Sequence, residues 1–189
     1  MDQKVGLEID NWDAWCKFPH VEPIVIVTSI DKDGVADGAL KSTFAIVNMN
    51  PMVVVFSCTT KHQTARNILE TKEFVVNFPS EDIIKETMAT TRDYRRGVDK
   101  IKESGLTTVP AKTVRPPLIK ECNSHLECVL EWTKRYGSAV VIAGRVLHAW
   151  IDKRFLEVPD EDRCRLAKSI VIAAVGRYGV VKDSSPFPE

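Results

Sequence analysis

Short runs of apolar residues recur along the chain, and residues typical of turns separate them. The runs are rich in β-branched and aromatic side chains, which favours strands over helices. Short strands at a spacing of roughly ten residues are typical of an antiparallel barrel rather than a parallel βαβ sheet. We therefore predict a mainly β fold with strands at Ile24–Ile30, Ala45–Val47, Val53–Phe56, Phe74–Phe78, Cys122–Thr133 and Val140–Trp150.

Other segments lack this strand pattern. Residues 107–119 carry three prolines and are expected to be extended and exposed. For Leu166–Val175 the apolar pattern fits either a helix or a late strand, so both interpretations remain open. The spacing of apolar residues and the capping signals predict helices over Ala65–Thr71, Ser80–Arg96 and Val98–Ser104.

A polar loop follows the apolar run that ends at Phe56 and leads into the first predicted helix. Helix N-termini present unpaired N–H groups and a partial positive charge, so such a loop is suited to hold a phosphate. Thr64 stands where the cap of the helix is expected, and its hydroxyl either caps the helix only or also contacts a phosphate. The loop brings hydroxyls, an ammonium group and an imidazole together through Ser57, Thr59, Lys61 and His62.

Small residues mark places where the backbone approaches another group closely. Asp31–Gly34 predicts a hairpin turn, and the short segment after it contains Gly38 and Ala39. These two residues either let a flat ligand approach the backbone or have no role. Gly144, inside a predicted strand, indicates a β-bulge or a close contact.

The composition fits one domain of ordinary size, and we assign residues 1–189 to it. With 44% hydrophobic residues the chain is able to bury a substantial core. Its formal net charge is zero, which gives no indication of a nucleic acid or an anionic membrane as partner. No apolar run approaches the ~20 residues of a membrane span, so we expect none.

The cysteines and histidines give no sign of a disulfide framework or a metal site. The five cysteines are odd in number and include no C-x-x-C motif, and the four histidines lack metal-ligand spacing. Free thiols, together with an N-terminal segment that does not look like a signal peptide, lead us to expect a cytoplasmic protein. No nucleophile–base pair is recognisable either, so an enzyme of this sequence would depend on a cofactor for its chemistry.

The order of several motifs resembles the flavin reductase-like family of FMN-binding split barrels, and within it the flavoredoxin branch. The most specific motif is TARNILETKEFVVNF, because it combines ligand and packing positions at fixed spacing. The others follow the family's order over residues ~21–150: PIVIVTSIDKDG, KSTFAIVNMNPMVVVF, GVDKIKESGLT, HLECVLE and VIAGRVLHAW. The resemblance implies a split β-barrel with peripheral helices that binds FMN non-covalently.

The resemblance also implies roles for particular residues. Thr64 matches a threonine of the phosphate loop, and Lys100, in GVDK, matches a lysine that helps to hold the cofactor. Phe44 matches the aromatic position next to the flavin, and Ser42 and Thr43 line the same segment through their backbone. The residues of the preceding loop belong to the same predicted site: Ser57, Thr59, Lys61 and His62.

Two positions depart from the family pattern. Asp37 stands where the family usually has asparagine, and a carboxylate there either repels the reduced, anionic flavin or points to water. Ser138 stands where many relatives have a histidine near the flavin ring, which puts efficient reduction by a nicotinamide in doubt. His148, further along the same predicted strand, is either a substitute for that histidine or an ordinary strand residue.

The function implied by the resemblance is that of a flavoprotein oxidoreductase. FMN would receive electrons from NADH or NADPH, or from a redox protein partner, and pass them to an acceptor. A flavin-binding electron carrier with little turnover is the main alternative, and a small β-barrel with an unrelated binding role is the third. Relatives pair as homodimers whose flavin sites lie at the subunit interface, so we expect a homodimer.

Overall fold

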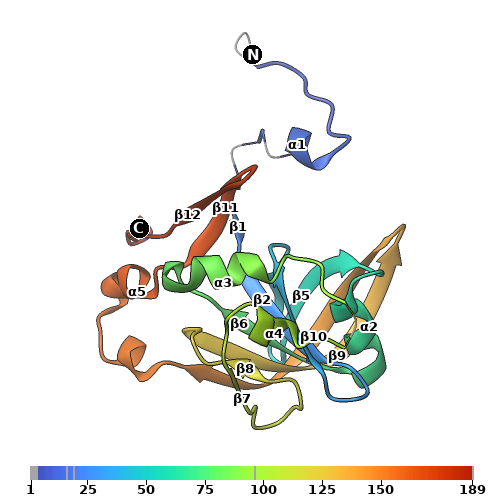
Figure 1. Ribbon diagram of the computed structural model, residues 1–189. Helices are drawn as coiled ribbons and strands as arrows, with labels where there is room; N and C mark the ends of the chain where they lie inside the picture. The colour runs from blue at the N-terminus through green and yellow to red at the C-terminus, as the bar shows by residue number, and fades with distance from the viewer. Residues whose placement is uncertain (1–3, 16, 19, 96, 189) are drawn as a thin grey trace.

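The computed structural model describes residues 4–15, 17–18, 20–95 and 97–188. The protein is mainly β, with helices at the periphery of its sheets (Figure 1). The strands are β1 (Glu22–Pro23), β2 (Val25–Ile30), β3 (Ala36–Lys41), β4 (Ala45–Met49), β5 (Met52–Thr59), β6 (Glu73–Phe78), β7 (Thr108–Val109), β8 (Leu118–Ile119), β9 (Ser124–Tyr136), β10 (Ala139–Ile151), β11 (Ile170–Ala174) and β12 (Arg177–Val180). The helices are α1 (Trp12–Trp15), α2 (Gln63–Thr71), η1 (Glu81–Ile83), α3 (Ile84–Ala89), α4 (Lys100–Glu103), η2 (Lys153–Leu156) and α5 (Asp160–Ala167), of which η1 and η2 are 3₁₀-helices.

Seven antiparallel strands form the main sheet, in the order β3-β2-β6-β9-β10-β5-β4. Phe56, Phe74 and Ile142 are among the fully buried side chains of its principal core cluster. The register between β9 and β10 shifts at Gly144, where an added Cβ would lie 2.2 Å from the Phe74 ring. Gly144 therefore lies at a β-bulge and also packs closely against Phe74. All the strands that the β-branched runs predict are present in the structure.

The predicted helix over Ser80–Arg96 is wrong in its second half. The structure has η1 and then α3, which ends at Ala89. The hydroxyls of Thr90 and Thr91 donate to the carbonyls of Thr87 and Met88, each at 2.7 Å. Such local side-chain bonds compete with the helix ladder, so the chain leaves the helix here and continues as a loop. The predicted end at Arg96 lies outside the described residues.

The prediction that residues 107–119 are extended and exposed is wrong for most of the segment, because β7 and β8 pair antiparallel and residues 112–116 bend between them. Val114, Leu118 and Ile119 are buried, the last of them completely. The amide oxygen of Asn77, on β6, accepts the N–H of Ile119 at 2.9 Å and also contacts Nδ1 of His125 at the same distance. The hydrogen bond between Asn77 and Ile119 therefore attaches the proline-rich segment to the sheet.

A buried carboxylate, Glu127 on β9, holds the same segment in place. It accepts hydrogen bonds from the backbone N–H of Lys112 at 2.9 Å and of Thr113 at 2.6 Å, and from the Thr113 hydroxyl. The indole N–H of Trp150, on β10, donates to it at 2.7 Å. Burial alone would raise the pKa of Glu127, but these hydrogen bonds outweigh burial and lower the pKa to about 2.

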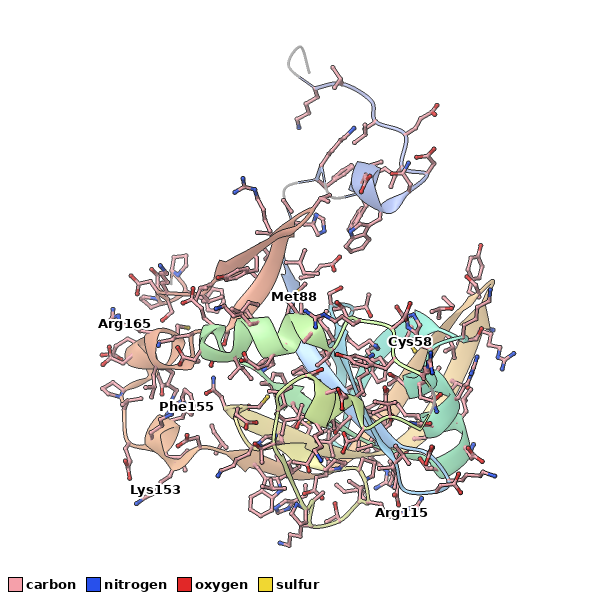
Figure 2. All side chains as sticks on the ribbon, viewed as in Figure 1. Cys58, Met88, Arg115, Lys153, Phe155 and Arg165 are labelled. Atoms are coloured by element: carbon pink, nitrogen blue, oxygen red, sulfur yellow. The ribbon has the colours of Figure 1, made fainter. Side chains whose placement is uncertain are left out.

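A surface ion pair adds to this attachment. The Arg115 side chain, labelled in Figure 2, places its Nε 2.8 Å from Oε2 of Glu73 on β6. Because the guanidinium is largely exposed, water screens the pair and its contribution to stability is small. The buried Glu127 is therefore the stronger anchor of the two.

The C-terminal part resolves the ambiguity over Leu166–Val175. Helix α5 ends at Ala167, and the apolar residues that follow form strand β11. This strand joins β1 and β12 in a three-stranded antiparallel sheet. Figure 1 shows that this sheet, with the N-terminal segment that carries α1, projects from the main body.

The remaining sequence expectations concern thiols, metals and membranes. The four cysteines in the described part are free, and Cys16 lies outside it. No group of His, Cys, Asp and Glu side chains suited to hold a metal ion occurs among the described residues. Within the same residues, no helix has the length and apolar character needed to cross a membrane.

We expect Glu127→Gln to lower the free energy of unfolding at pH 7 by roughly 1–3 kcal/mol for each donor it leaves unpaired. The stability that the ionised carboxylate contributes is complete above its ordinary pKa and is lost as pH falls toward the folded pKa of about 2. Urea unfolding of wild type and variant across this acidic range measures both effects. Glu131→Gln, which removes an exposed partner of Arg145, is the matched control. Equal losses in the two variants would contradict the anchoring role of Glu127.

Candidate functional site

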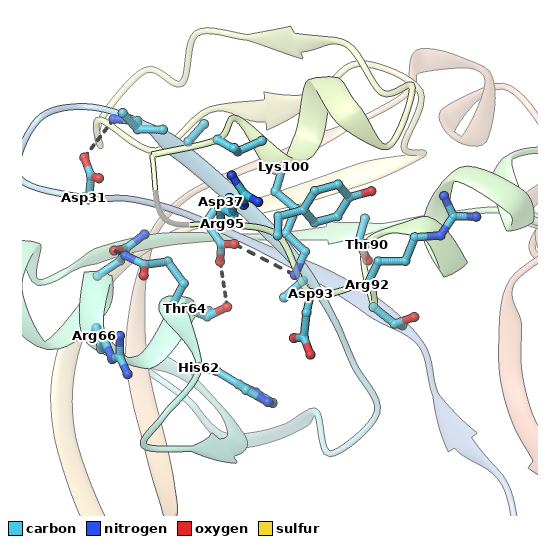
Figure 3. Close-up of a pocket in the computed structure, with 18 of the residues that line it drawn as sticks. Asp31, Asp37, His62, Thr64, Arg66, Thr90, Arg92, Asp93, Arg95 and Lys100 are labelled. Carbon is cyan, nitrogen blue, oxygen red and sulfur yellow. Dashed lines mark hydrogen bonds and ion pairs between the residues drawn. The ribbon is translucent and has the colours of Figure 1, made fainter.

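A cavity of about 450 Å³ opens between β3, the start of α2, and the loop that follows α3 (Figure 3). Helix α4 completes its wall through Lys100. Four separate parts of the sequence therefore meet here: the end of the first hairpin, the polar loop with the start of α2, the segment that begins at Thr90, and the start of α4. The charged and polar residues that line the cavity are Asp31, Asp37, Lys41, Lys61, His62, Gln63, Thr64, Arg66, Asn67, Thr90, Thr91, Arg92, Asp93, Tyr94, Arg95 and Lys100.

Asp37, on β3, lies at the centre of this arrangement (Figure 3). Its side chain is buried, and its Oδ2 accepts a hydrogen bond of 2.8 Å from the Thr64 hydroxyl on α2. Its Oδ1 lies 4.0 Å from Nζ of Lys100, at the start of α4. Of the two interpretations of this departure, pointing to water is wrong, because the carboxylate points to two protein groups and joins three elements.

Thr64 is not the cap of helix α2, and this prediction is wrong by two residues. The N-cap is His62, which makes no capping hydrogen bond through its side chain. Thr64 is the second residue of the helix, and its hydroxyl donates to Asp37 instead of capping the helix. As a result, the backbone N–H groups of Gln63, Thr64 and Ala65 have no acceptor among the described residues.

The cavity is basic although the whole chain has no net charge. Among the described residues, six Lys and Arg side chains line it against three Asp side chains, whereas the whole chain has 26 basic and 26 acidic residues. The basic residues come from four places in the sequence and surround the start of α2. The local excess of positive charge, with the unpaired N–H groups of α2, favours an anionic ligand.

Burial lowers the pKa of two basic groups of the cavity, Lys41 and His62. Lys41 is 7% exposed, and its Nζ donates to the carbonyl of Leu40 at 3.2 Å. Burial lowers the pKa of Lys41, while Cys58 and Asp37 act in the opposite direction. Burial, and then the charges of Lys41 and Lys100, also lower the pKa of His62. At neutral pH His62 therefore offers a neutral ring rather than a further positive charge.

Packing explains why a glycine stands at position 38, and neither sequence interpretation, a flat ligand or no role, included this explanation. An added Cβ would lie 2.8 Å from Cγ1 of Ile101 and 3.7 Å from Cγ2 of Ile26. The glycine therefore admits the fully buried Ile101 of α4 rather than a flat ligand. Because Lys100 precedes Ile101, this close packing also fixes where the Lys100 side chain enters the cavity.

The predicted site residues fall into two groups in space. The structure brings the first group together around the cavity: Asp37, Lys61, His62, Thr64 and Lys100. The other group does not line it: Ser42, Thr43, Phe44, Ser57, Thr59 and Ser138. The two groups meet along the chain, because Lys41 lines the cavity and Ser42 follows it.

Most members of the second group follow β3 or lie on β5. The Thr43 hydroxyl accepts the backbone N–H of Ser57 at 2.8 Å, and the two hydroxyls are 3.1 Å apart. The Phe44 ring packs edge-on against Phe78, with their centroids 5.5 Å apart, at the margin of the main core. The Thr59 hydroxyl accepts a hydrogen bond from the backbone N–H of Lys61 at 3.4 Å. These contacts attach the segment after β3 to β5 and β6.

Ser138 and His148 lie elsewhere. Ser138 is exposed in the turn between β9 and β10, where its carbonyl accepts the backbone N–H of Thr60 at 2.9 Å. His148 is stacked edge-on against Trp150, with centroids 4.7 Å apart. Neither side chain lines the cavity.

Sequence reasoning missed most of the basic residues around the cavity. The sequence places Arg66, Arg92 and Arg95 in predicted helices, where a charged side chain is usually solvated. Lys41 stands inside the motif that carries the resemblance, and a single lysine beside apolar residues is its only local signal. The remaining signal, charge spread over four segments, becomes meaningful only when the fold brings these segments together.

A family model described as a flavin reductase like domain matches residues 19–161. The chain belongs to this family. An uncharacterized protein of Aquifex aeolicus is 37% identical over 113 residues, which are 57% of this chain and 58% of that protein. The match thus spans less than two thirds of that relative's length.

Three solved structures share the fold. Nitrilotriacetate monooxygenase component B from Bacillus cereus has a TM-score of 0.87 and 24% identity, over 98% of this chain and 100% of the other. A flavoredoxin from Methanosarcina acetivorans has a TM-score of 0.82 and 21% identity, over 98% and 95%. A protein from Shewanella frigidimarina, described as a flavin reductase with a split barrel domain, has a TM-score of 0.82 and 15% identity, over 89% and 86%. The predicted split β-barrel is therefore confirmed.

Proposed function

We propose that the cavity binds flavin mononucleotide and that the protein passes electrons from a donor to an acceptor through this flavin. The donor is NADH, NADPH or a redox protein. The observation that carries the proposal is the excess of basic side chains around the unpaired N–H groups at the start of α2, in a chain with no net charge. That combination suits a phosphate group, which FMN carries at one end.

The size of the cavity supports the proposal. About 450 Å³ lies within the ~300–1,000 Å³ of typical small-molecule sites. Gln63 and Thr64 line the cavity, and their backbone N–H groups stand with that of Ala65 in the first turn of α2, where the helix dipole favours an anion. Arg66 follows them on the same helix and adds a charge. These groups would hold the phosphate.

The flavin ring requires a second surface, and the ordered segment after Lys41 is our candidate. Backbone groups of Ser42 and Thr43 would face the polar edge of the ring, and the Thr43–Ser57 hydrogen bonds keep this segment in one conformation. Bound flavin supplies the transfer of a hydride or of electrons, so the protein has to bind and orient it and control access to it. Lys41, between the cavity and this segment, would place a buried amine near the junction of the two parts.

We further propose that two copies of the chain complete the site. All five residues of the edge strand β4 are exposed, and Ile46, Val47 and Met49 are 52%, 55% and 70% exposed. An apolar edge strand beside the segment of Ser42 and Thr43 is suited to pair with a second copy, which would then cover the flavin.

Sedimentation equilibrium is expected to give a dimer with or without FMN, and a monomer at micromolar concentration would contradict this part of the proposal.

The proposed function is tested by adding FMN to the purified protein and titrating the complex with NADH or NADPH without oxygen. We expect FMN to bind and one of the two nicotinamides to bleach the flavin absorbance. If FMN binds but neither nicotinamide reduces it while a chemical reductant does, the protein is an electron carrier fed by a redox protein. If no flavin binds, the proposal is wrong.

We expect Lys100→Met to weaken FMN binding about tenfold, which corresponds to ~1.4 kcal/mol, because it removes a basic group from the cavity and leaves Asp37 without its neutralising partner. Lys102→Met is the matched control, since Lys102 is exposed on the same short helix and does not line the cavity. Fluorescence titration of FMN gives both dissociation constants. The wild-type affinity should fall as the salt concentration rises. Equal affinities of the two variants at low salt would place Lys100 outside the binding site.

A further inference from the structure

A buried carboxylate stands inside a cavity that is otherwise suited to an anion, and Asp37 is that carboxylate. We propose that Asp37 sets how strongly the cavity prefers phosphorylated over unphosphorylated flavins, by engaging Thr64 and neutralising Lys100. The inference rests on the proposed function and adds a specificity-determining residue to it. Its ligand class is the flavin with or without a terminal phosphate, that is, FMN against riboflavin.

The first argument is the hydrogen bond of Thr64. A threonine hydroxyl has one proton, and here that proton is donated to Asp37 Oδ2 at 2.8 Å. Only lone pairs remain on the Thr64 oxygen, so it is able to accept from a ligand hydroxyl but not to donate to a phosphate oxygen. The phosphate therefore depends on the backbone N–H groups of α2 and on the other basic residues.

The second argument is the charge of the pair with Lys100. Oδ1 of Asp37 and Nζ of Lys100 are 4.0 Å apart, and their side chains are 8% and 16% exposed. Burial reduces screening by water, so the negative charge cancels most of the attraction that Lys100 would offer to a phosphate. A phosphate with close to two negative charges is more strongly affected than the uncharged end of riboflavin.

The third argument is the fixed position of the carboxylate. Asp37 is held by α2 on one side and by α4 on the other, and Gly38 next to it is packed against Ile101. A different rotamer of Asp37 would have to break the bond to Thr64. The cavity therefore presents this negative charge to every ligand that enters it, and wild-type protein is expected to prefer FMN over riboflavin less strongly than a variant without the charge.

The test compares the dissociation constants of FMN and riboflavin for wild type and Asp37→Asn, measured by fluorescence titration. Asparagine has the same shape and no charge. We expect the variant to bind FMN about tenfold more tightly or better, and riboflavin within about threefold of wild type, because only the phosphate interacts with the removed charge. The readout is the dissociation constant of riboflavin divided by that of FMN, which is expected to rise in the variant. This ratio does not depend on the fraction of protein that is folded.

Asp93→Asn is the matched control. It removes the same charge from the same cavity, but Asp93 is exposed, so solvent screens it. The control should change the ratio by less than about threefold. Asp37→Ser provides a second neutral variant in case the asparagine variant folds poorly, and it should change the ratio in the same direction.

Two results would overturn the inference. If both flavins bind but the neutral variants leave the ratio at its wild-type value, Asp37 does not determine the preference, and the proposed function stands. If wild-type protein binds neither flavin, the proposed function is wrong and this inference falls with it. A ratio that rises in both Asp37 variants and not in the Asp93 control supports the inference.

Discussion

The cavity depends on one interaction, the contact of the Asp37 carboxylate with Thr64 and Lys100. It connects strand β3, helix α2 and helix α4, which are separated by up to 63 positions in the sequence, from residue 37 to residue 100. A buried carboxylate is costly unless it is paired, so the three elements are constrained to meet at this point. Gly38 and Ile101 reinforce the same junction by apolar packing. The site is therefore rigid where α2 begins.

A second buried carboxylate, on the central strand β9 of the sheet, performs a comparable task. Glu127 receives donors from residues 112 and 113 and from Trp150, and so attaches the proline-rich segment to β9 and β10. The two carboxylates differ in their partners. Glu127 is satisfied by neutral N–H and O–H donors, whereas Asp37 has a hydroxyl and an ammonium group. The first arrangement is purely structural, and the second contributes charge to a cavity.

Charge in this protein is organised locally. The chain holds equal numbers of acidic and basic residues, yet the described residues that line the cavity include twice as many basic as acidic side chains. Overall charge therefore carries no information on the ligand, whereas the arrangement around α2 does. The family assignment and this arrangement are independent observations, because the first comes from the sequence of residues 19–161 and the second from the fold around α2.

The sequence by itself determined the β-rich class, most strand positions, helix α2 and the polar loop before it, because these follow from side-chain shape and from spacing over a few residues. Tertiary structure decided the rest. Ile119 is buried because Asn77, 42 residues away, accepts its N–H. The loop after α3 is held against β3 because the Thr90 hydroxyl accepts the N–H of Leu40, 50 residues away. Likewise, Arg66, Arg92 and Lys41 share a cavity only because the fold brings their segments together. Such long-range contacts leave no periodic pattern along the chain, so no reading of local spacing could have located them.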